Sequence, residues 1–437
     1  MNKKVLILLL AGQLLAFMAK SQDTLLISKD DLVQRVLQNN LQSKIAEQQT
    51  AMAKGDLNQS KALYLPSISA TQTSMMTNNP LMAFGSKLNQ ERLTAADFDP
   101  NRLNDPDRIE NYSVEVQVLQ PLLNLDGVYQ RQAAQIQVEA YELQAARIQE
   151  HMEMEATKAY MQLQLAYEAV SVLERAKYTA DQGLKLINDY FDQGLVKRAD
   201  VLDVAVRQIE VENQLRYAKS NIRNASDGLA TLLGTVIDGT VYKPQSTISS
   251  RLQTEDFSNL LSQDRKDLIA MNKALLGHEK MLKSNKMSAL PRVNAFGNYQ
   301  VYDNNAFGFG ADGYLVGLQI SWNIFDGNKN VGKVQKAQAM VEKATIEKEN
   351  YTQQAQFELN KTNRQLADAE NKVELSQKAF EQKAEAYRIR KDRFMEGLEK
   401  TADLLMAETQ MFQKELEHLQ ALFEYNLTKE YLRFLTR

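Results

Sequence analysis

The chain of 437 residues contains an internal duplication, which restricts its fold to two similar halves. FDQGLVKRADVL begins at Phe191 and FMEGLEKTADLL begins at Phe394, and seven of the twelve positions are identical at an offset of 203. A second pair lies at an offset of 202, where YSVEVQVLQPLLN begins at Tyr112 and YLVGLQISWNIFD begins at Tyr314. Two matches at nearly one offset indicate a duplicated half-molecule, since solenoid repeats have periods of only about 20 to 50 residues.

The N-terminus has the layout of a secretory signal peptide. Lys3 and Lys4 precede an apolar run that ends at Ala19, and small and polar residues follow. Cleavage is expected after Ala19 or Ser21, so residues 1–21 are removed and the mature chain is exported. An N-terminal membrane anchor is the alternative, although the run is shorter than the ~20 residues that span a bilayer.

Composition excludes several classes of site. The chain has no cysteine, so it offers no disulfide or thiolate metal site. No run of 18 apolar residues follows residue 19, so any later membrane span must be built of strands. Interspersed charges leave no basic stripe for a nucleic acid. We expect no catalysis, metal or cofactor, because the three histidines lack ligand spacing: His151, His278 and His418.

Two intervals without glycine or proline predict very long helices. They cover 55 residues from Val128 to Gln182 and 64 residues from Lys333 to Glu396, and at 1.5 Å per residue each is about 80 to 95 Å long. Their composition favours helix. In the first interval the apolar spacing averages 3.5, as in helices that pack along a shared seam. This seam contains Ala156, Ala159, Leu163, Ala166, Val170 and Leu173.

Each long helix is expected to reverse at the duplicated motif. Gly194 and Gly397 suit a reversal that requires positive φ. Asp200 and Asp403 then lie near the start of a returning helix, where a carboxylate can cap free amides. The return helices are expected at about 199–233 and 402–434, and two further helices at 28–63 and 254–290.

Two segments alternate apolar and polar residues over about ten positions and have aromatic ends, as strands of membrane barrels do. Weaker alternation precedes them in residues 67–75 and 292–302. Half-buried strands of a soluble sandwich are the alternative. The predicted lipid-facing residues are Tyr112, Val114, Val116, Val118, Tyr314, Val316, Leu318, Ile320 and Trp322.

Four strands cannot close a barrel by themselves. An open sheet in lipid leaves about five unsatisfied backbone groups on each edge, and their cost reaches tens of kcal/mol. The chain must therefore share its sheet with copies of itself. A dimer would give eight strands, a trimer twelve and a tetramer sixteen, and this argument leaves the choice open.

The order of helix, strand pair and helical hairpin, repeated twice with these paired segments, resembles the TolC-type outer membrane efflux proteins. The resemblance covers essentially the whole mature chain. It implies a homotrimer that combines a long α-helical barrel in the periplasm with a twelve-stranded β-barrel in outer membrane lipid. It also implies a passive exit duct of a tripartite efflux or type I secretion system, fed by a periplasmic adaptor and an inner-membrane transporter. An exported trimeric coiled-coil structural or adhesion protein with a β-barrel anchor is the alternative, although an anchor does not need duplicated strand pairs.

On this pattern, residues 22–234 form the first repeat and 253–437 the second, joined by a link at 235–252. Strands are expected at 64–76, 111–121, 291–303 and 313–323. The helical hairpins are expected at 125–234 and 328–435, with tips near 191–200 and 394–403.

The resemblance also implies roles for single residues. In the family the hairpin tips dock the adaptor, and the matching residues here are Gly194, Leu195, Asp200, Leu202, Gly397, Leu398, Asp403 and Leu405. Family members can close the periplasmic end with an acidic ring, but here the stretch before the second turn is basic, with Asp392 and Glu396 as the only acids expected nearby. Its arginines are expected either to pair between protomers or to remain solvated. The aperture candidates are Arg388, Arg390, Asp392, Arg393 and Glu396, beside Lys391.

An insertion distinguishes the first repeat from the second. LPSISA from Leu65 and LPRVNA from Leu290 lie at an offset of 225, so the first repeat has 23 extra residues near 79–110. This segment is expected to be an extracellular loop, since barrels of this kind keep their longer loops outside. Phe84 and Phe98 would fold it over the mouth as a lid, or the segment would be a mobile surface loop.

Overall fold

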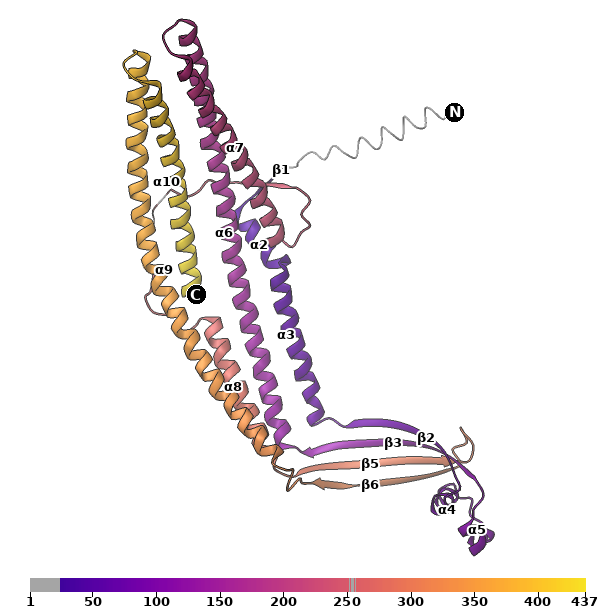
Figure 1. Cartoon of the computed structure of the whole chain (residues 1–437). Helices are drawn as coiled ribbons and strands as arrows, with labels where there is room; N and C mark the ends of the chain where they lie inside the picture. Colours follow the sequence, from indigo (N-terminus) through magenta and orange to yellow (C-terminus); the bar gives the residue numbers. More distant parts are fainter. Residues whose placement is uncertain (1–23, 251, 253–254, 256) are drawn as a thin grey trace, which may run out of the picture. The chain divides into compact units, whose positions relative to one another are not determined.

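The structure is a computed structural model that describes residues 24–250, 252, 255 and 257–437 (Figure 1). The predicted signal peptide lies outside the described residues. The chain divides into two compact units. The first unit comprises Met1–Gln48, Leu143–Ile269 and Asn350–Arg437, and the second comprises Gln49–Glu142 and Ala270–Glu349.

The second unit contains a four-stranded antiparallel sheet. Its order is β2 (Ser67–Thr77), β3 (Ile109–Leu123), β5 (Arg292–Asp303) and β6 (Ala311–Ser321). The four strands lie side by side in Figure 1. Because β3 and β5 pair, the strand pairs of the two repeats join into one sheet. Four strands and long helices from a duplicated sequence are the fold class that we predicted.

The register places the apolar positions of β3 and β6 on the same face. Val116 on β3 is opposite Tyr299 on β5, and Tyr299 is opposite Tyr314 on β6. Paired residues share a face, and successive residues alternate between faces. The face that contains these three residues is called the apolar face, and the opposite face, with Glu115 and Gln117, is called the polar face. On β6 the side chains of the apolar face are largely exposed to solvent; Leu318, for example, is 69% exposed.

Both outer strands of the sheet have a free edge. Within the described part of the chain, β2 pairs only with β3 and β6 pairs only with β5. Each edge therefore presents backbone N–H and C=O groups without a strand partner.

Four long helices form two hairpins. The first hairpin is α6 (Leu125–Asp192) and α7 (Arg198–Leu232), and the second is α9 (Lys329–Met395) and α10 (Thr401–Thr436). The helices α6 and α9 contain 68 and 67 residues, so each is about 100 Å long. Gly183 lies inside α6, which means that one glycine does not end a helix that is held by packing.

The predicted apolar seam of α6 lies in the core of the first unit. Leu163 is fully buried against Leu229 of α7 and Leu32 of α2 (Lys29–Asn39). Further along α6, Val170 and Leu173 pack with apolar residues of α7. Burial of such a seam, rather than helix propensity, provides most of the stability of helices in proteins.

The N-terminal helix differs from the prediction. Instead of one helix over 28–63, the chain forms α2, α3 (Leu41–Gln59) and the short 3-10 helix η1 (Ser60–Leu63). Asn40 causes the break, because its side-chain oxygen accepts a hydrogen bond from the amide of Gln42 at 2.8 Å while its amide donates to the carbonyl of Leu232 at 2.9 Å. The helix expected from residue 254 also begins later, as α8 (Lys266–Met287).

A small parallel sheet lies within the first unit. β1 (Thr24–Ile27) pairs with β4 (Val241–Pro244), which belongs to the link expected at 235–252. Ile27 and Tyr242 are buried in the same core as Leu163. The link is therefore anchored by strand pairing that the sequence analysis did not predict.

A buried ionic network holds the end of α10. Asp267 accepts hydrogen bonds from Arg265 at 2.6 Å and from the Tyr351 hydroxyl at 2.7 Å, and it lies 3.2 Å from Arg147. The two arginines also donate to the carbonyls of Phe434 and Leu435 near the C-terminus of α10. Cations at this end satisfy free carbonyls and the negative end of the helix dipole.

The network controls the ionisation of Asp267. Burial would raise its pKa, but the hydrogen bonds from Arg265 and Tyr351 and the charges of both arginines outweigh burial and lower the pKa to about 2. A depressed carboxyl pKa stabilises the fold above the pKa of the unfolded chain, near 4. This contribution is lost as the pH falls through 2.

Asp267→Asn should lower the free energy of unfolding by about 3 kcal/mol at pH 7, because it leaves buried guanidinium charges without their counterion. The difference from the wild type should shrink as the pH falls from about 4 to about 2, where the wild-type carboxyl becomes neutral. Denaturant unfolding followed by circular dichroism measures both effects. The matched control is Asp264→Asn on the exposed neighbour, and equal stability of the two variants at pH 7 would contradict the assigned role.

Candidate functional site: the helical turns and the sheet

The two hairpin turns have the same backbone geometry. Gly194 and Gly397 have φ of 72° and 74°, a region that glycine enters without a Cβ clash. In the first turn the amide of Gly194 donates to Phe191 and the amide of Leu195 donates to Tyr190. The second turn repeats this pattern with Gly397 and Leu398. Both turns are Schellman motifs, which satisfy the last carbonyls of α6 and α9.

The predicted aspartate caps are not equivalent. Asp200 accepts a hydrogen bond from the amide of Lys197 at 3.0 Å, which caps the start of α7. Asp403 occupies the matching position in α10, but no capping hydrogen bond of its side chain occurs among the described residues. Only the first turn therefore shows the predicted cap.

Leucines at the turns divide into exposed and packed side chains. Leu195 and Leu398, next to the two glycines, are 66% and 63% exposed. Leu202 is also exposed, whereas its repeat partner Leu405 packs against an apolar cluster. Of the four predicted docking leucines, Leu405 is therefore the only one that is not exposed.

The apolar cluster near the turns connects the two hairpins. Ile187 of α6 and Val204 of α7 pack with Phe394 of α9. The ring of Tyr190 is stacked on Phe394 with 6.0 Å between the centroids. The turns therefore rest on a shared core rather than on separate hairpins.

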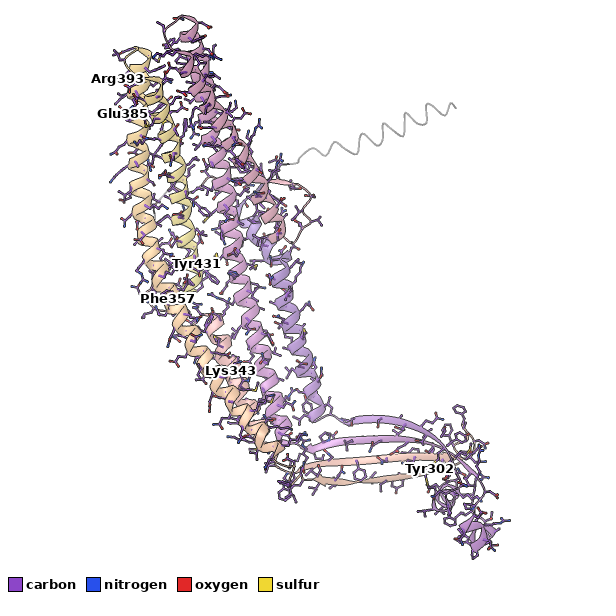
Figure 2. All side chains as sticks on the ribbon, viewed as in Figure 1. Tyr302, Lys343, Phe357, Glu385, Arg393 and Tyr431 are labelled. Atoms are coloured by element: carbon purple, nitrogen blue, oxygen red, sulfur yellow. The ribbon has the colours of Figure 1, made fainter. Side chains whose placement is uncertain are left out.

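The arginines before the second turn have carboxylate partners in their own chain. Arg388 donates to Glu385 at 2.7 Å and to Asp392 at 3.2 Å. Arg390 and Arg393 both donate to Glu399, at 3.3 and 3.0 Å. Figure 2 shows Glu385 and Arg393 on the part of α9 that leads into the turn. The two pairs with Glu399 tie the end of α9 to the chain beyond the turn.

The expectation that Asp392 and Glu396 are the only nearby acids was wrong. Glu385 lies one helical turn before Arg388, and Glu399 returns to α9 because the chain reverses at Gly397. Glu396 itself is exposed and has no side-chain partner among the described residues. The spacing of Glu385 and Arg388 was a readable signal, but the contact of Glu399 depends on the folded turn.

The insertion forms three short helical segments: α4 (Pro80–Asn89), the 3-10 helix η2 (Ala95–Phe98) and α5 (Pro100–Asn104). Phe84 and Phe98 contact each other edge to face with 5.7 Å between centroids. Lys87 and Asp97 form an ion pair at 2.7 Å, and the hydrogen bond from Lys87 lowers the pKa of Asp97. The two aromatic rings thus hold the insertion together internally.

The end of α4 lies against the polar face of the sheet. The buried side chain of Gln90 donates to Asn111 at 2.8 Å, and Asn111 shares the polar face with Glu115. Gln90 also donates to the carbonyl of Asp303, at the same end of the sheet. A polar cavity of about 350 Å³ separates this part of the insertion from Asn298, Gln300 and Tyr302 of β5.

The three histidines do not form a common site. His151 lies beside the ring of Phe434, and His418 forms a hydrogen bond with the hydroxyl of Ser376 at 3.1 Å. In the part of the chain that the structure describes, no group of three or more His, Cys, Asp or Glu side chains could bind a metal ion.

No helix of the described residues has both the length and the apolar character needed to cross a lipid bilayer.

Two buried charged residues near the turns were missed by the sequence analysis. Glu408 of α10 is only 4% exposed, and Arg207 of α7 is 7% exposed. The spacing along α10 indicates this burial, since Glu408 lies seven residues after Thr401 and four before Phe412, and both of these residues are buried. A carboxylate in that heptad spacing occupies a core position.

Comparisons with known proteins agree on one family. The sequence model described as outer membrane efflux protein matches residues 32–235 and 258–436. A search of curated protein sequences finds no match.

Solved structures with the same fold include three bacterial proteins. The CmeC outer membrane channel of Campylobacter jejuni is 17% identical with a TM-score of 0.81, over 93% of this chain and 85% of that chain. The outer membrane protein VceC of Vibrio cholerae is 17% identical with a TM-score of 0.78, over 93% and 96%. The MtrE outer membrane channel of Neisseria gonorrhoeae, in its open state, is 16% identical with a TM-score of 0.76, over 93% and 88%. At these identities the likeness concerns the fold.

Proposed function

This chain belongs to the outer membrane efflux protein family, and on that premise we propose that three copies join their sheets into one twelve-stranded barrel that conducts cargo out of the cell. The chain is an outer membrane efflux channel. Family membership favours this function over an enzyme and over an exported coiled-coil stalk. The observation that carries the barrel proposal is a sheet with one apolar face and two free edges.

Closure between copies follows from strand direction. All three pairings in the sheet are antiparallel, so β2 and β6 run in opposite directions. The β6 of one copy can therefore pair antiparallel with the β2 of the next, and both strands contain 11 residues. Repeating this contact gives an even number of alternating strands without an edge, as lipid requires. The number three comes from the family resemblance, because the sheet alone would allow other rings.

Exposed apolar stripes on the long helices support contacts between copies. Val206 and Ile209 are exposed and three residues apart, so they share one face of α7. On α9, Leu375 and Ile389 are also exposed and lie 14 residues, about four helical turns, apart. An apolar stripe on a helix is stabilised when another helix covers it. In a ring of hairpins, a neighbouring copy would do so.

The hairpin turns are proposed to dock a periplasmic adaptor that connects the channel to an inner-membrane transporter of an efflux or type I secretion system. Leu195 and Leu398 support this role, because each presents an exposed apolar side chain beside a rigid glycine turn. Leu202 extends the first docking surface. Leu405 packs against the apolar cluster under the second turn and would support this turn instead of contacting the adaptor.

The basic stretch before the second turn is proposed to line the periplasmic aperture. Its exposed ion pairs within the chain contribute little stability each. Arg388, Arg390, Lys391 and Arg393 balance the charges of Glu385, Asp392, Glu396 and Glu399. In a narrow passage these cations would keep the four carboxylates from attracting positive ions. Pairing between protomers, one of the two expected arrangements, would have to compete with Glu385 and Glu399.

The insertion is proposed to narrow the outer mouth of the barrel. Gln90 fixes α4 to the polar face of the sheet, which is the face turned to the lumen in this proposal. In such a lid, Gln90 would attach the insertion to the sheet. The contact between Phe84 and Phe98 would stabilise the fold of the insertion itself.

Trp322 provides a test of the barrel proposal, because it is the single tryptophan and directly follows the apolar face of β6. In liposomes, its fluorescence should be strongly quenched by lipids with brominated acyl chains. In the matched variant Trp322→Phe with Leu315→Trp, the indole moves to the polar face, and quenching should largely disappear. Equal quenching of both proteins would mean that the apolar face does not contact lipid.

Docking at the turns can be tested with cysteines, since the chain has none of its own. Leu195→Cys and Leu398→Cys, each carrying a photo-crosslinker, should form adducts with a periplasmic adaptor in intact cells. Ser220→Cys, at an exposed site on α7 away from the turn, is the control and should form no such adduct. Adducts of equal yield at all three positions would argue against docking at the turns.

Removing the arginines before the second turn should increase the ion current through the channel. Arg388→Ala, Arg390→Ala and Arg393→Ala together should raise single-channel conductance in a planar bilayer and shift the reversal potential toward cations. The control removes three charges from exposed sites on α7, with Arg216→Ala, Lys219→Ala and Arg223→Ala. Unchanged conductance and selectivity in the first variant would remove this stretch from the aperture.

A further inference from the structure

A cavity lies between the two hairpins, close to both turns. Its volume is about 160 Å³, and four helices contribute to its wall. Most of the lining is apolar or aromatic, and it includes Ile187 of α6, Val204 of α7, Phe394 of α9 and Leu404 of α10. Tyr178 is 68% exposed, so the wall that it forms borders solvent.

One of the charged groups in this wall is buried. Glu408 lines the cavity and is only 4% exposed, and its Oε1 atom makes no hydrogen bond among the described residues. A buried carboxylate oxygen without a donor is unfavourable, because it has lost its water and gained no replacement. The cavity therefore contains an unused strong acceptor in an apolar surrounding.

The charged and titratable neighbours of Glu408 do not supply the missing bond. Arg207 of α7 is buried, but its Nε makes no hydrogen bond among the described residues, and its Nη1 forms an ion pair with Glu210 at 3.7 Å. Lys391 of α9 also lines the cavity, but its side chain is exposed to water, which screens its charge. Burial raises the pKa of Glu408 to about 7 although both cations oppose this shift, and burial with the Glu408 charge raises the pKa of Tyr387 to about 12.

We propose that this cavity is a binding site for a small protonated amine that carries an apolar ring. The ammonium group would donate to the free oxygen of Glu408, and the ring would lie among the apolar and aromatic side chains of the wall. Charge-assisted hydrogen bonds are the strongest of their kind, and the faces of Tyr178, Tyr387 and Phe394 can add cation–π attraction.

The size of the cavity limits the ligand to one ring. An apolar protein cavity of about 150 Å³ accommodates benzene, so a benzylammonium ion is near the upper limit here. Gly183 supports the assignment, since a Cβ added to it would meet only Val204, at 3.9 Å. The absence of a side chain at this point of α6 leaves space that a larger residue would fill.

The test uses the purified full-length protein and 4-fluorobenzylammonium, with binding measured by 19F NMR. The wild type should bind this ion, and its affinity should fall about tenfold from pH 8 to pH 6 as Glu408 becomes protonated. Glu408→Gln should weaken binding about tenfold at pH 8 and abolish the pH dependence. Neutral 4-fluorobenzyl alcohol should bind the wild type and Glu408→Gln with affinities within about threefold of each other.

Two further variants locate the site. Glu417→Gln removes an exposed carboxylate of α10 and should leave the affinity unchanged. Gly183→Leu fills the cavity without altering Glu408 and should prevent binding of both probes. Equal affinity of the wild type and Glu408→Gln, binding retained in Gly183→Leu, or no binding to the wild type at millimolar concentration would each overturn the proposal.

Discussion

Unpaired backbone groups at a sheet edge set the main constraint on this protein. In water an open edge is tolerable, because solvent supplies hydrogen bonds, but in lipid each free N–H or C=O group costs several kcal/mol. Among the described residues, the sheet of this chain has free edges on β2 and β6. One of its faces is apolar, and exposure of this face to water is unfavourable. An outer membrane channel built from such a sheet needs neighbouring copies, so assembly is a condition of the membrane-embedded state rather than an addition to it.

Duplication produced two hairpins with the same backbone and different surroundings. Gly194 and Gly397 have nearly the same φ, because the Schellman turn is determined locally. Leu202 and Leu405 nevertheless differ in exposure, since only the second hairpin turns this position toward the shared core. A repeated sequence therefore gives one turn geometry but two distinct docking surfaces.

Two buried carboxylates show how partners decide the state of a charge. Asp267 accepts hydrogen bonds from Arg265 and Tyr351 and forms an ion pair with Arg147, and these contacts outweigh the cost of burial, so its pKa is low. Glu408 is buried with cations nearby, its Oε1 accepts no hydrogen bond within the described part of the chain, and burial raises its pKa to about 7. The first arrangement anchors the end of α10, whereas the second leaves an acceptor available beside a cavity.

Local patterns in the chain were enough to predict the long helices, the four strands and the glycine turns, because helix propensity, alternation and positive φ act over a few neighbouring residues. Family resemblance then supplied the outer membrane efflux function and suggested the docking residues. Contacts between distant segments could not be read in this way: Glu399 returning to Arg390, Gln90 holding α4 on the polar face, β1 pairing with β4, and the cavity beside Glu408. Each depends on where the folded backbone brings side chains that lie far apart along the chain, and only the tertiary structure fixes those distances.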